Sequence, residues 1–67
     1  MAAVEVAIRN LRAGRSGLQD EIDKFKVLLG NTHDKAEERE LRYQIKESVM
    51  RIGAIDYALN FLESEEE

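Results

Sequence analysis

Apolar residues in the first half of the chain recur at alternating spacings of three and four. They occupy Met1, Val4, Ile8, Leu11, Leu18, Ile22, Phe25 and Leu29, and Arg15 takes the one remaining position of the series. This spacing places them on a narrow stripe of an α-helix, at the a and d positions of a heptad, whereas a strand would alternate by two. The pattern predicts a helix from about residue 3 to residue 29.

The second half repeats the pattern. Its stripe consists of Leu41, Ile45, Ser48, Ile52, Ile55, Leu59 and Leu62, and it predicts a helix over about 34–62, followed by an acidic tail at 63–67. Between the helices we expect a turn at about 30–33, in which Gly30-Asn31 adopts the left-handed conformation that often ends a helix. Asp34 and Glu37 have the spacing of a capping box, with Thr32 as the competing cap.

So short a connection makes the two helices antiparallel neighbours. The stripes then match layer by layer: Phe25 faces Leu41 and Ile22 faces Ile45, and the facing residue numbers sum to 66 or 67 throughout. A constant sum is what an antiparallel pair requires, because both helices rise equally per residue. The sequence therefore predicts an all-α fold, an antiparallel two-helix hairpin resembling a coiled coil, as a single domain over 1–67.

The second helix carries another apolar stripe. Its members are Tyr43, Met50, Ala54, Tyr57 and Phe61, and Glu47 completes the spacing of three and four. At about 100° per residue this stripe lies roughly opposite the first, so a hairpin cannot bury both. A contiguous exposed apolar face indicates an interface, and a dimer forming a four-helix bundle is the simplest way to cover it. The alternative is that these residues merely border a monomeric core.

Helix one has small or modest residues on its own outer face, which would let a neighbouring backbone approach. These are Ala3, Val6, Ala13 and Gly17.

Arg15 and Ser48 form a polar layer in the predicted seam. A polar layer can fix the register or the oligomeric state of a coiled coil, and Glu47 or Asp56 is the candidate partner of Arg15. The alternative is that Arg15 lies at the edge of the seam and extends its charge into solvent. Two of the four glycines lie in the segment 14–17, where they could interrupt the first helix.

The distribution of charge bears on the expected binding partners more than on the expected fold. Charged residues make up 36% of the chain and the net charge is -4, with five basic and four acidic side chains in residues 1–30 and five and ten in 31–67. Four acid-before-base pairs lie four residues apart on the helices, and each adds a few tenths of a kcal/mol. They are Glu5 with Arg9, Asp20 with Lys24, Glu38 with Arg42, and Glu47 with Arg51. Nucleic-acid affinity is not expected of so acidic a chain.

The composition also limits compartment and chemistry. The chain contains no cysteine and so forms no disulfide. No apolar run reaches the roughly 20 residues that span a bilayer, and the N-terminus lacks the basic-then-apolar order of a signal peptide. We therefore expect a cytoplasmic protein without membrane contact. The single histidine, His33, falls in the predicted turn and has no cysteine or second histidine beside it. We expect no metal, cofactor, small-molecule substrate or catalytic activity.

These features favour a non-enzymatic protein-interaction module, an adaptor, regulator or small assembly factor that works as a homo-oligomer, most simply a homodimer, with a further protein partner. One alternative is a nucleic-acid-binding regulator built on a dimeric hairpin, which in architecture and length resembles the small RNA-binding hairpin proteins of plasmids. Its basic residues would be Arg9, Arg12, Arg15, Arg39, Arg42, Lys46 and Arg51. Another is a structural component of a phage or mobile element.

Overall fold

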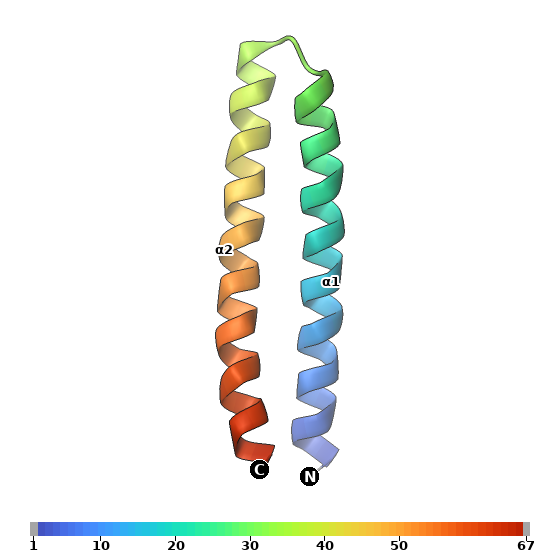
Figure 1. Ribbon diagram of the computed structural model, residues 1–67, viewed down its shortest axis with the longest axis vertical. Helices are drawn as coiled ribbons and strands as arrows, with labels where there is room; N and C mark the ends of the chain where they lie inside the picture. Colours follow the sequence, from blue (N-terminus) through green and yellow to red (C-terminus); the bar gives the residue numbers. More distant parts are fainter. Residues whose placement is uncertain (1, 67) are drawn as a thin grey trace.

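The protein is a hairpin of two long α-helices. The structure, a computed structural model, describes residues 2–66 and the side chains of residues 3–64. Helix α1 spans Ala2–Asn31 and helix α2 spans Lys35–Glu66, and they lie side by side in opposite directions, with both chain ends at the same end of the hairpin (Figure 1). The molecule measures 50 × 14 × 12 Å. Within residues 2–66, neither helix offers a segment apolar and long enough to cross a membrane.

The two apolar stripes form the seam between the helices. Every described stripe position is buried or half-buried, and Met1 lies outside the described residues. The apolar side chains that are buried are Ile8, Ile22, Leu41 and Leu59. The remaining apolar members of the stripes are half-buried, because two helices alone cannot surround a side chain from all directions. The hairpin therefore has a seam instead of an enclosed core.

The turn reverses the chain with three residues, 32–34. Asp34 caps α2: its Oδ1 accepts the backbone N–H groups of Ala36 at 2.9 Å and Glu37 at 3.5 Å, and its carbonyl accepts the first helical bond from Glu38. The other half of the expected capping box is wrong, because the N–H of Asp34 donates to Thr32 Oγ1 at 3.3 Å and not to Glu37. Asp34 is thus the cap of α2, and Thr32 accepts the N–H of Asp34 that Glu37 would accept in a capping box.

The expected helix terminator is also wrong. α1 continues through Gly30 and ends at Asn31, and no residue in the described part of the chain has a positive φ. The Thr32 and Asp34 hydrogen bonds organise the turn with ordinary backbone angles, so a left-handed residue is not required.

Neither the central glycines nor the acidic end interrupts a helix. α1 is continuous across residues 14–17, where a Cβ added at Gly14 would meet Ile55 Cδ1 at an ordinary 3.8 Å and one at Gly17 would meet nothing within 4 Å. Close packing of the two helices therefore does not require a glycine at position 17. At the other end, α2 runs on to Glu66, so most of the expected tail extends the helix; Glu67 lies outside the described residues.

Replacing Asp34 with alanine should lower the free energy of unfolding by about 1 kcal/mol, because two N–H groups of the first turn lose their acceptor. Urea unfolding followed by circular dichroism measures this, at one fixed protein concentration because any self-association makes stability depend on concentration. Glu37→Ala is the matched control and should cost less. An equal or larger loss for Glu37→Ala would contradict the capping seen here.

Candidate protein interface on the outer face of α2

The second apolar stripe of α2 is exposed along its length. We call Tyr43, Met50, Ala54, Tyr57 and Phe61 the outer stripe. Their seam-facing neighbours Leu41, Ser48 and Leu59 are buried, so the outer stripe faces away from α1. The exposed fractions of its large side chains are 56% for Tyr43, 63% for Met50, 77% for Tyr57 and 62% for Phe61. The hairpin leaves three of its four aromatic side chains mostly in water.

Glu47 belongs to the outer stripe by position and is tied to it by a hydrogen bond. The hydroxyl of Tyr43 donates to Glu47 Oε1 at 2.8 Å, one turn further along α2. The hydrogen bond to Glu47 and its negative charge raise the pKa of Tyr43, with smaller contributions from desolvation and from Glu40. This bond uses one oxygen of the carboxylate that the sequence paired with Arg51.

A shallow apolar hollow of about 440 Å³ lies at the C-terminal end of the outer stripe. Its lining residues are Tyr57, Ala58, Phe61 and Leu62, all on α2. Leu62 belongs to the seam and Tyr57 to the outer stripe, so the hollow joins the half-buried edge of the seam to the exposed face. Ala58 and Leu62 were not among the expected interface residues, since Ala58 lies between the two stripes on the helix wheel and Leu62 belongs to the seam.

The outer face of α1 differs from that of α2. Its exposed large apolar side chains are Val6, Val27 and Leu28, which lie near the two ends of the helix and are separated by charged residues. The small residues Ala13 and Gly17 are exposed between them. Only α2 therefore presents a continuous apolar row on its outer face.

Arg15 and Ser48, the residues of the predicted polar layer, have no hydrogen bond to each other. Ser48 is buried in the seam with an exposed fraction of 5%. Arg15 lies at the edge, where its Nε donates to Asp56 Oδ1 at 2.7 Å and the two side chains remain 44% and 45% exposed. Of the two candidate partners, Asp56 is the one with which Arg15 forms an ion pair.

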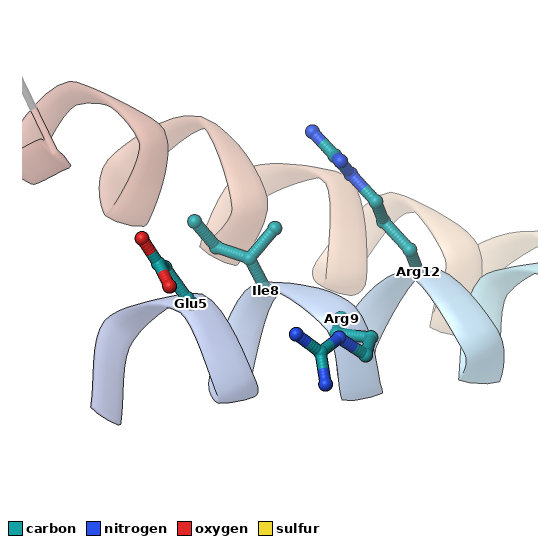
Figure 2. Close-up of a pocket in the computed structure, with 4 residues that line it drawn as sticks. All are labelled: Glu5, Ile8, Arg9 and Arg12. Atoms are coloured by element: carbon teal, nitrogen blue, oxygen red, sulfur yellow. The ribbon is translucent and has the colours of Figure 1, made fainter. Parts of the chain in front are cut away.

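A second ion pair joins the helices near the chain ends. Arg12 Nη2 lies 2.9 Å from Glu63 Oε1, a contact that the stripe pattern did not indicate because the two residue numbers sum to 75 and not to the 66 or 67 of facing layers. Figure 2 shows Arg12 extending from α1 toward α2, whereas Arg9 turns away from it. Together with Glu5 and Ile8 these arginines line a shallow hollow of about 310 Å³.

The basic residues are partly neutralised within the hairpin. Arg12 and Arg15 pair across the helices, and Arg42 pairs with Glu38 at 3.1 Å along α2. Glu38 with Arg42 is the one expected four-apart pair that closes to an ion pair among the described side chains. His33 is exposed in the turn, and residues 2–66 contain no group of three or more histidine, aspartate or glutamate side chains placed to hold a metal ion.

Comparison with known proteins gives no match: neither a protein family, nor a curated protein, nor a solved structure is significantly similar to this chain.

Arg15→Leu should leave the molecular mass in solution unchanged and alter the free energy of unfolding by no more than about 1 kcal/mol, because exposed ion pairs contribute little. Light scattering measures the mass and urea unfolding measures the stability. Asp56→Asn, which removes the other charge, should give a similarly small change. A changed oligomeric mass for Arg15→Leu would show instead that Arg15 sets the assembly state.

Glu47→Gln should lower the pKa of Tyr43 toward its ordinary value, because deprotonating the phenol no longer places two negative charges side by side. Ultraviolet absorbance reports the titration, and a Tyr57→Phe background leaves Tyr43 as the single tyrosine. Glu40→Gln is the control and should have a smaller effect, since Glu40 contributes least to the shift. An unchanged pKa in Glu47→Gln would exclude the hydrogen bond in solution.

Proposed function

We propose that this hairpin is a non-enzymatic protein-interaction module that pairs with a second copy of itself through the outer stripe of α2. The dimer is a four-helix assembly and serves as an adaptor, regulator or small assembly factor for a further protein. The observation that carries the proposal is the row of exposed side chains from Tyr43 to Phe61 on the face of α2 that α1 does not cover.

The composition of the row supports an interface. Tyrosine, phenylalanine and methionine are enriched where proteins bind one another, whereas scattered single apolar residues on a surface carry no such meaning. Here they follow one helix face at regular spacing over 43–61, which at 1.5 Å per residue is about 27 Å. Such a face fits another helix laid along it.

The total surface area points the same way. A compact monomer of 7.7 kDa exposes about 4,300 Å², whereas this hairpin exposes 5277 Å². The excess of roughly 900 Å² is similar to the 800 Å² that each partner buries in a standard protein interface. Pairing of two hairpins through the outer stripe would remove part of this excess exposed area from each chain.

The nucleic-acid alternative gains no support from the side chains. Three of the seven arginine and lysine residues that would form its basic patches are engaged by Glu63, Asp56 and Glu38. Releasing them for phosphate contacts would break those ion pairs and leave the carboxylates close to the nucleic acid. Self-association through the outer stripe does not require these three ion pairs to break.

Tyr57→Glu should weaken self-association by about 2 kcal/mol or more, over tenfold in the dissociation constant, because it places a charge in the centre of an aromatic contact. Light scattering across a concentration series measures the shift toward monomer. Val49→Glu is the matched control, since Val49 is 52% exposed on the same helix but lies off the outer stripe. It should leave the dimer intact.

Circular dichroism of both variants checks that they remain helical. A wild-type chain that stays monomeric at high micromolar concentration would refute the proposed self-association. Equal disruption by Val49→Glu would place the contact elsewhere on α2.

A further inference from the structure

We infer that the second copy binds with its own α2 antiparallel to the first, in the register where facing residue numbers sum to 104, so that Tyr57 of one copy meets Glu47 of the other. The inference rests on the proposed function, since it specifies how the same outer stripe is occupied. It places the two α2 helices in the middle of a flat four-helix bundle, with the α1 helices outside.

The spacing of the outer stripe determines this register. Positions 43, 50 and 57 form one column of a heptad and positions 47, 54 and 61 form the other. In an antiparallel pair each layer joins one column to the opposite column of the other helix. One register brings all six positions into layers, and its pairs are Tyr43 with Phe61, Glu47 with Tyr57, and Met50 with Ala54, each formed twice about the two-fold axis.

The side chains are complementary in that register. Met50 faces the small Ala54, which leaves room for its long side chain, and Tyr43 faces Phe61 as an aromatic pair. Glu47 already accepts one hydrogen bond from Tyr43 in its own chain and has a second oxygen free to accept the hydroxyl of Tyr57 from the second copy. The three polar groups of the stripe, two tyrosine hydroxyls and the Glu47 carboxylate, are thereby hydrogen-bonded within the contact.

Glu47 also selects the orientation of the helices. A parallel pair would bring Glu47 of one copy against Glu47 of the other, and two carboxylates with like charge in a dry contact repel each other. The antiparallel pair separates the two carboxylates and gives each one a tyrosine hydroxyl. A single acidic residue in an otherwise apolar row therefore disfavours the parallel alternative.

Charge at the ends of α2 agrees with this orientation. The start of α2 is neutral on balance, because Lys35, Arg39 and Arg42 are offset by Glu37, Glu38 and Glu40, whereas the sequence of its end is acidic from Glu63 onward. In the register with sum 104, the acidic end of one α2 lies beside this neutral start of the other. A parallel pair would instead place the two acidic ends together.

The contact is large enough for a weak but specific dimer. With aromatic side chains of about 150–250 Å² each, the exposed parts of Tyr43, Met50, Tyr57 and Phe61 amount to on the order of 500 Å² per copy. Two copies would bury about 1,000 Å² from these residues, which reaches the lower limit for a biological interface.

Registers shifted by one heptad cover less of the stripe. A shift toward the chain ends pairs Met50 with Phe61 and leaves Tyr43 and Glu47 outside the contact, whereas the opposite shift pairs Met50 with Glu47 and leaves Tyr57 and Phe61 outside. Each shift keeps four of the six layers. The central register loses no aromatic side chain to solvent.

Disulfide exchange can read the register directly, because the chain contains no cysteine. Met50→Cys protein is mixed in turn with Glu47→Cys, Ala54→Cys or Phe61→Cys protein in a glutathione redox buffer, and mass spectrometry measures each disulfide. We expect Met50→Cys with Ala54→Cys to exceed every other pair by about tenfold, since a disulfide needs Cα atoms within about 7 Å. Val49→Cys, off the stripe, is the control for random pairing.

Each of the other possible disulfides would identify a different arrangement of the two helices. A predominant disulfide between two Met50→Cys chains would show a parallel pair, one with Phe61→Cys or Glu47→Cys would show a shifted register, and each result would overturn the inference while leaving the proposed dimer in place. Light scattering of the wild-type chain and of the reduced variants provides the separate test. Monomers in that measurement would refute the proposed function itself.

Discussion

Two helices packed along a single seam can bury only a few side chains, and this geometry limits how the hairpin can be stabilised. The apolar side chains that are buried, Ile8, Ile22, Leu41 and Leu59, are spread over the length of the seam, and the others in the stripes keep one side in water. A larger bundle would cover them with a third and fourth helix. The hairpin exposes more surface area than a compact chain of the same mass because it consists of only two helices.

The polar contacts specify the arrangement more than they stabilise it. Arg12 with Glu63 and Arg15 with Asp56 both run from α1 to α2, but their side chains are about half exposed, so each contributes at most about 1 kcal/mol. Both pairs link α1 to α2 toward the end of the hairpin that carries the chain termini. The capping of α2 by Asp34 fixes where the second helix starts and thus how the stripes align.

Helical periodicity is a local property, so the sequence alone predicts both helices, their antiparallel packing and the exposure of Tyr43, Tyr57 and Phe61. The turn was predicted less well, because a glycine terminator and a side-chain cap from Thr32 and Asp34 both satisfy the local pattern, and only the backbone path decides between them. The partner of Arg15 depends on the side of the seam to which its long side chain turns, which spacing does not encode. Glu47 likewise has two possible partners four residues away on its own helix, Arg51 and Tyr43, and its hydrogen bond is to Tyr43.

The two helices differ in the number of apolar faces that a neighbouring helix must cover. α1 has one apolar stripe, and its outer face mixes charged and small residues with the separate apolar side chains Val6, Val27 and Leu28, which is the pattern of a helix at the surface. α2 has two apolar stripes on opposite sides, which is the pattern of a helix with neighbours on both. A hairpin supplies α2 with only one neighbour, and self-association that places α2 against α2 supplies the other while leaving α1 on the outside. The difference between the two helices is thus consistent with one assembly geometry. In that geometry α2, which has apolar stripes on both sides, lies at the centre, and α1, which has one stripe, lies on the outside.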